Sequence, residues 1–256
     1  MKILTINLPL LKECGSGCFK YCDSLTSINM SMLERCGNDC FRWCNSLLAI
    51  SIPMLEQCGS DCFSSCRSLT TISLQMLEQC DDDCFRLCGS LKSINMSMLE
   101  RCGNDCFRWC ESLLTINMPS LEQCGGGCFS SCDSLTAIYL PMLRRCDDYC
   151  FRLCESLLTI NMPSLEQCGG DCFSRCDSLL TIILPSLWKC AYDCFRLCNS
   201  LLAISMPMLE QCGSDCFSSC RSLTTISLPV LKQYGRGCFS NCDSLKSIIT
   251  ELEVTA

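Results

Sequence analysis

Cysteine is the residue type with the greatest chemical potential in this sequence. It accounts for 32 of the 256 residues, whereas histidine is absent. Cysteine sulfur can bind soft metal ions, form disulfides or act as a nucleophile. Without histidine the chain lacks the Ser-His-Asp and Cys-His arrangements of many hydrolases. No carboxylate pair with contrasting surroundings stands out as a general acid and base, so we do not expect an enzyme.

The cysteines follow a fixed period. Triplets with the spacing Cys-x3-Cys-x3-Cys recur every 22 residues and define eleven repeats. The first row of cysteines contains Cys14, Cys36, Cys58, Cys80, Cys102, Cys124, Cys146, Cys168, Cys190 and Cys212. The middle row contains Cys18, Cys40, Cys62, Cys84, Cys106, Cys128, Cys150, Cys172, Cys194, Cys216 and Cys238. The third row contains Cys22, Cys44, Cys66, Cys88, Cys110, Cys132, Cys154, Cys176, Cys198, Cys220 and Cys242. In the last repeat Tyr234 stands where the first-row cysteine would be.

A period of this length is typical of a repeat solenoid. Within each unit a segment such as residues 5–8 alternates polar and apolar residues, which predicts a short strand with one buried face. The segment that follows, for example residues 33–44, is expected to return as a short helix or 3₁₀ stretch, with the Asp before the middle cysteine as its cap. One unit cannot bury its apolar face alone, so stacked units should share a continuous core.

The units resemble leucine-rich repeats of the BspA-like (bacterial surface antigen A) type. The residues that carry the resemblance are Cys58-Gly59-Ser60-Asp61-Cys62-Phe63, followed by Cys66, Leu69 and Ile72. The match extends over about residues 3–250, with residues 251–256 as a C-terminal tail of a single domain, 1–256. It implies a leucine-rich-repeat β-solenoid or horseshoe of parallel short strands, and roles in adhesion or protein binding, often at cell surfaces. The family has Ile or Leu at the first row and Ala at the middle row, so cysteine is a departure at both.

Conservation of sulfur in the three rows suggests that sulfur itself is needed. Apolar strand positions exchange freely between repeats, whereas the cysteine rows hardly vary. If the return segment is helical, cysteines four residues apart lie about 5–6 Å apart on one face. Stacked repeats add a step of about 4.8 Å. This spacing favours iron–sulfur clusters, each held by four cysteines. The leading hypothesis is that all 32 cysteines ligate an array of iron–sulfur clusters for electron transfer or storage, with Cu(I) or Zn²⁺ as alternative metals.

The main alternative is a reduced, metal-free cysteine core in a scaffold for protein interaction or adhesion. Reduced cysteine packs as a small apolar residue, and duplication copies it passively. Disulfides are a third interpretation, but three parallel rows give each cysteine two equivalent neighbours and no defined partner. Redox sensing requires exposed thiols of low pKa, which buried rows do not offer.

Composition and patterning also limit the partners. The net charge of −7 argues against a nucleic-acid partner. No apolar run is long enough to span a membrane, so we expect no membrane insertion. The outward strand positions are mostly Thr, Ser and Asn, which predicts a solvated sheet face. The first repeat has no polar cap, which predicts end-to-end self-association. The sequence begins without a signal peptide, which predicts a cytoplasmic protein with free thiols.

Overall fold

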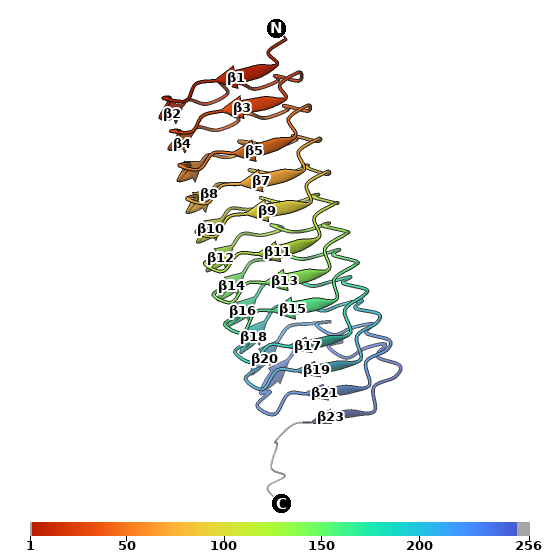
Figure 1. Cartoon of the computed structure of the whole chain (residues 1–256). Helices are drawn as coiled ribbons and strands as arrows, with labels where there is room; N and C mark the ends of the chain where they lie inside the picture. Colours follow the sequence, from red (N-terminus) through yellow and green to blue (C-terminus); the bar gives the residue numbers. More distant parts are fainter. Residues whose placement is uncertain (1, 250–256) are drawn as a thin grey trace, which may run out of the picture.

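A computed structural model describes residues 2–249, which form a stack of flattened turns with one turn for each 22-residue repeat. Figure 1 shows the turns following one another in sequence order from the top of the column to the bottom, with the two ends of the chain at opposite ends of the stack. The predicted parallel β-solenoid is therefore confirmed. The predicted tail, residues 251–256, lies outside the described residues.

One side of the column consists of three-residue parallel strands. In each strand the central residue points into the core and the outer two point outward, as Thr5, Ile6 and Asn7 do. The strands are β1 (Thr5–Asn7), β3 (Ser27–Asn29), β5 (Ala49–Ser51), β7 (Thr71–Ser73), β9 (Ser93–Asn95), β11 (Thr115–Asn117), β13 (Ala137–Tyr139), β15 (Thr159–Asn161), β17 (Thr181–Ile183), β19 (Ala203–Ser205), β21 (Thr225–Ser227) and β23 (Ser247–Ile249). They form four parallel sheets, β1-β3, β5-β7-β9, β11-β13-β15 and β17-β19-β21-β23. Within each sheet neighbouring strands pair in a register of 22 residues, for example Ile6 with Ile28.

A second strand in each repeat ends at the first-row position. It has only two residues, too few to show the alternation by which a strand is recognised in a sequence, and the sequence did not predict it. These strands form one continuous parallel sheet of 11 strands. They are β2 (Glu13–Cys14), β4 (Arg35–Cys36), β6 (Gln57–Cys58), β8 (Gln79–Cys80), β10 (Arg101–Cys102), β12 (Gln123–Cys124), β14 (Arg145–Cys146), β16 (Gln167–Cys168), β18 (Lys189–Cys190), β20 (Gln211–Cys212) and β22 (Gln233–Tyr234).

The return segments are turns, so the predicted helical or 3₁₀ returns are wrong. Their backbone hydrogen bonds run mainly to the next repeat, as from the N–H of Phe41 to the carbonyl of Cys62 at 2.7 Å. Two residues of most segments are left-handed, for example Asp39 with φ 57° and Trp43 with φ 64°. Bonds inside the segment are short-range and isolated, as from the N–H of Arg42 to the carbonyl of Asp39 at 3.2 Å. A helix needs consecutive right-handed residues, and the left-handed residues interrupt that sequence. Asp39 therefore caps no helix, and its carboxylate pairs with Arg42 at 2.9 Å.

The left-handed position before the middle cysteine gives a first testable prediction. At this position Gly127 has φ +64°, and an added Cβ would meet Oδ1 of Asp105 at 2.3 Å. A β-branched residue is strongly disfavoured at positive φ. Gly127→Val is expected to reduce the free energy of unfolding by about 2 kcal/mol.

The matched control is Gly126→Val. Gly126 does not have positive φ, and other repeats place larger side chains such as Asn38 and Tyr192 at its position. This variant should lose less than about 1 kcal/mol, as for most surface changes. Denaturant unfolding of both variants measures the difference. Equal losses at the two positions would show that backbone conformation does not limit residue 127.

The interior is a continuous core of Leu, Ile, Met, Phe and Cys side chains. Its centre is a column of eleven stacked phenylalanines, one from each repeat, with ring centroids 5.1–5.6 Å apart. Within residues 2–249, no helix is long and apolar enough to cross a membrane. The stacked rings divide the core, and the cysteine rows lie on different sides of them.

Candidate functional site: two kinds of cysteine row

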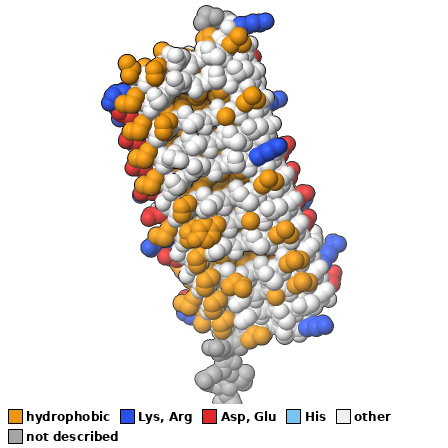
Figure 2. Space-filling model, viewed as in Figure 1, with side chains coloured by type: hydrophobic (Ala, Val, Ile, Leu, Met, Phe, Trp, Pro, Cys, Tyr) orange, Lys and Arg blue, Asp and Glu red, His pale blue; other side chains and the backbone are white. Residues whose placement is uncertain are grey.

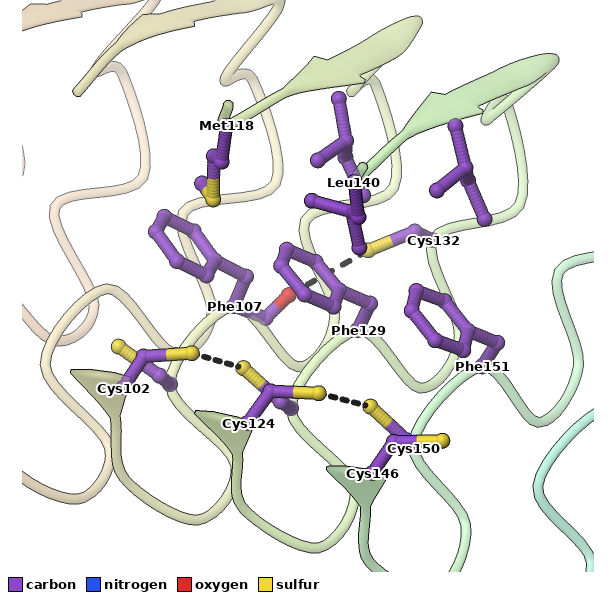
Figure 3. Packing of buried hydrophobic residues seen from close by; sticks show 14 of the residues in the cluster. Cys102, Phe107, Met118, Cys124, Phe129, Cys132, Leu140, Cys146, Cys150 and Phe151 are labelled. Carbon is purple, nitrogen blue, oxygen red and sulfur yellow. Dashed lines mark hydrogen bonds between the residues drawn. The ribbon is translucent and has the colours of Figure 1, made fainter. Parts of the chain in front are cut away.

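The third row of cysteines has a structural role of its own. Each thiol from Cys44 onward donates a hydrogen bond to the carbonyl of the phenylalanine 25 residues earlier, at sulfur–oxygen distances of 3.0–3.4 Å. Figure 3 shows one such bond, from Cys132 to the carbonyl of Phe107. A buried polar group needs a partner, and these thiols have one in every repeat. The third row therefore binds successive turns together without any metal.

The first and middle rows contact each other instead. The sulfur of a first-row cysteine lies 3.0–3.3 Å from the sulfur of the middle-row cysteine 26 residues later, in the next repeat. This contact joins Cys14 with Cys40, Cys58 with Cys84, Cys80 with Cys106, Cys102 with Cys128, Cys124 with Cys150, Cys146 with Cys172, Cys168 with Cys194, Cys190 with Cys216 and Cys212 with Cys238. Cys36 and Cys62 stand in the same register, and a hydrogen bond between their thiols shifts the pKa of both.

We call this series of ten pairs the sulfur ladder. Figure 3 shows it as a chain of sulfurs running along the column axis, with the rings of Phe107, Phe129 and Phe151 between the ladder and Met118 and Leu140. First-row residues are 1–6% exposed, and the middle row is fully buried except near the ends. Cys18 lies outside the ladder and is exposed.

Burial and hydrogen bonds from neighbouring thiols shift the pKa values of the cysteines in opposite directions. Burial raises the pKa of Cys66 in the third row, because its thiolate would lie in an apolar interior. In the ladder, hydrogen bonds from Cys40 and Cys62 lower the pKa of Cys36. Burial raises the pKa of its partner Cys62. Hydrogen bonds from other thiols therefore favour a thiolate at the first-row positions Cys36, Cys58 and Cys146. At most other cysteines of the ladder, as in the third row, burial favours the neutral thiol.

The predicted iron–sulfur array gains no support from this arrangement. Among residues 2–249, no group of three or more Cys, Asp or Glu side chains is placed to hold a metal ion. Four thiolates around Zn²⁺, with bonds near 2.3 Å, would stand about 3.8 Å from one another in a tetrahedron. The sulfurs form close pairs instead, and the third row is separated from them by the phenylalanine column. The expected sheet of evenly spaced thiols depended on a helical return segment, which the structure lacks. The assignment of iron–sulfur clusters, or of Cu(I) or Zn²⁺, to the 32 cysteines remains a prediction.

A second candidate site lies on the face of the three-residue strands, where the sequence predicted only a solvated surface. Figure 2 shows apolar side chains gathered along this face. One set directly precedes the strands: Leu48, Leu114, Leu158, Leu180 and Leu202, with 46–54% of each side chain exposed. Another follows the strands: Met32, Met54, Met76, Met98, Met142 and Met208. The polar residues between them are linked in places, as by the 2.8 Å bond between the side chains of Asn29 and Asn7.

Sequence reasoning missed these leucines although a signal was available. Each is the second leucine of a Leu-Leu pair whose first member is buried, as Leu47 is beside Leu48. In other repeats the same position holds Thr70 or Lys92. A position that accepts lysine is a surface position, so a leucine there is an exposed apolar group.

The chain matches the family model of the BspA type leucine rich repeat region over residues 12–136, 78–201 and 186–256. The protein therefore belongs to the BspA-type leucine-rich-repeat family, and the resemblance seen in the sequence is confirmed. No curated protein matches the sequence significantly.

Solved structures share the fold. A leucine rich cell surface protein from Faecalibacterium prausnitzii aligns with a TM-score of 0.53 and 20% identity, covering 99% of this chain and 80% of the other. A leucine-rich repeat protein from Bacteroides ovatus aligns with a TM-score of 0.52 and 20% identity, covering 97% and 84%. The pneumococcal vaccine antigen PcpA aligns with a TM-score of 0.55 and 19% identity, covering 98% and 69%.

These relatives contradict the predicted cytoplasmic location. The family is of a surface-antigen type, and the structures include a cell surface protein and a vaccine antigen, which point to the outside of a cell. The prediction was wrong because it relied on the first residues of the sequence, which do not decide where a protein functions. The accompanying expectation of free thiols depended on the same reasoning, since thiols stay reduced mainly in the cytosol.

Proposed function

We propose that this protein is a non-enzymatic scaffold that binds a protein partner outside the cell through its strand face. Family membership supports a leucine-rich-repeat scaffold. The observation that carries the proposal is the row of exposed leucines that directly precede the strands, which we call the apolar strip: Leu48, Leu114, Leu158, Leu180 and Leu202. Exposed apolar groups that gather on one face are typical of protein interaction sites. Predicted end-to-end association through the first repeat remains a separate prediction about this chain.

The strip is continuous over three neighbouring repeats. Leu158, Leu180 and Leu202 are 49%, 48% and 46% exposed and directly precede β15, β17 and β19. The backbone N–H of Leu202 donates to the carbonyl of Leu180 at 2.8 Å, so these residues are direct neighbours in the stack. Ile183, 67% exposed at the end of β17, adds apolar area on the same face. A partner that covers this region removes several large side chains from water at once.

A triple variant tests the proposal. The purified chain is expected to bind at least one member of a panel of immobilised extracellular-matrix proteins in a saturable manner. Combining Leu158→Lys, Leu180→Lys and Leu202→Lys should weaken that binding by at least about tenfold, because three charges replace the apolar contact. Binding is measured as a dissociation constant by biolayer interferometry.

The matched control adds the same charge to a different face. It combines Gln123→Lys, Gln167→Lys and Gln211→Lys in the two-residue strands β12, β16 and β20. This variant should bind as the unaltered chain does. The proposal is wrong if no panel member binds, or if the two triple variants lose affinity equally.

A further inference from the structure

The sulfur ladder places nine first-row sulfurs 3.0–3.3 Å from the middle-row sulfur 26 residues later, a grouping that the sequence alone could not provide. We propose that the ladder is a set of ten disulfide sites, each linking a first-row cysteine to the middle-row cysteine 26 residues later. In the structure all 32 cysteines are thiols. The sulfurs of nine of the pairs stand 3.0–3.3 Å apart, so a bond of about 2.05 Å requires each of these pairs to close by only about 1 Å.

The third row is excluded from this chemistry by its position. Its thiols donate to phenylalanine carbonyls, and the ring of Phe129 lies between Cys132 and the ladder in Figure 3. Complete oxidation of the ladder therefore leaves twelve thiols, which are Cys18 and the eleven cysteines of the third row.

Tyr234, which replaces the first-row cysteine of the last repeat, agrees with pairing between cysteines that are 26 residues apart in the sequence. Pairing within a repeat, four residues apart, would place Cys238 opposite Tyr234 and leave it without a partner. Pairing between repeats gives Cys238 the sulfur of Cys212, at 3.3 Å. Tyr234 is then outside the set of pairs, and its ring packs against Phe239 instead. The only first-row position without sulfur is thus the one that no pair uses.

The redox step needs an oxidant, for which a low-molecular-weight disulfide such as oxidised glutathione suffices. A ladder thiolate attacks one sulfur of the oxidant, forming a mixed disulfide and releasing one glutathione thiol. The partner thiol then displaces the second glutathione, so two protein thiols are oxidised and one glutathione disulfide is reduced. Stabilisation of a thiolate at Cys36 by its neighbours supports the first of these steps. For disulfides to form in the organism, the protein must lie in an oxidising compartment, which the proposed extracellular location supplies. Their formation in the purified chain does not depend on that location.

Cys190 provides the most direct test, because its neighbours yield fragments of different mass. The reduced full chain is refolded in a mixture of reduced and oxidised glutathione, and remaining thiols are alkylated in denaturant. Trypsin together with a protease that cleaves before Asp releases Cys190 in the fragment 190–192. We expect this fragment to be linked to 215–221, which contains Cys216, with Cys220 alkylated. A link to 193–196 would show pairing with Cys194, and a link to 197–214 would show pairing with Cys198 or Cys212. Either link would overturn the proposal, as would alkylated Cys190.

Two variants distinguish specific pairing from general oxidation. In Cys190→Ser, Cys216 should be recovered alkylated. In the matched third-row variant Cys198→Ser, whose thiol donates to Phe173 at 3.2 Å, the link between Cys190 and Cys216 should persist. Loss of that link in the third-row variant, or a new partner for Cys216 in the first, contradicts the proposal. These outcomes concern the purified chain alone, so they are independent of whether the strand face binds a partner.

Discussion

The oxidised protein is expected to withstand far more denaturant than the same protein kept in dithiothreitol. Each ladder disulfide closes a loop from a cysteine to another 26 residues later, and a loop of this length stabilises by about 3 kcal/mol in the chain-entropy model. Consecutive loops overlap only slightly, since the loop from Cys14 to Cys40 shares residues 36–40 with the next. Their contributions should therefore add over much of the column. Unfolding in guanidinium, followed by circular dichroism, compares the two midpoints.

A double variant isolates the effect of one pair. Replacing Cys124 and Cys150 together by alanine should cost the oxidised protein about 3 kcal/mol more than it costs the reduced protein, because only the oxidised form loses a cross-link. The packing change is the same in both redox states and cancels in the comparison. Equal midpoints for the oxidised and reduced unaltered chain would contradict the expected stabilisation.

Phe129→Ala is expected to destabilise the protein by about 3–5 kcal/mol, because truncating a fully buried phenylalanine leaves a cavity. The side chain of Phe129 is 0% exposed. Its ring stacks on Phe107 at 5.2 Å and on Phe151 at 5.3 Å, so the substitution also removes two aromatic contacts. In a solenoid each repeat is stabilised chiefly by its neighbours, and the loss should weaken the column at its centre. Equilibrium unfolding of the reduced protein measures the change.

Phe19→Ala serves as the control for this prediction. Phe19 is only partly buried and stacks on a single ring, that of Phe41 at 5.3 Å. Phe19→Ala should lower the free energy of unfolding by about half as much as Phe129→Ala does, because it removes less buried area and only one aromatic contact. If the two variants are equally destabilised, the stacked column does not act as the continuous core that the structure describes.

The sequence by itself determined the architecture of this protein. A strict 22-residue period means that equivalent residues stack, so the number of turns and the inward face of each three-residue strand could both be predicted. Ile6 and Ile28, for example, were expected to face inward from alternation alone, and they pair in register in β1 and β3. The family followed from the same residues, because its pattern lies in the core positions.

Only the tertiary structure decided how the cysteines are grouped. Spacing of four residues suggested one helical face, but the return segments hydrogen-bond to the next repeat and contain left-handed residues such as Asp39 and Trp43. First-row cysteines end a separate two-residue strand and meet the middle row of the following turn, whereas the third row lies beyond the phenylalanine rings. These contacts between cysteines form between neighbouring turns. A sequence period specifies which residues stack, but it does not specify which way their side chains point.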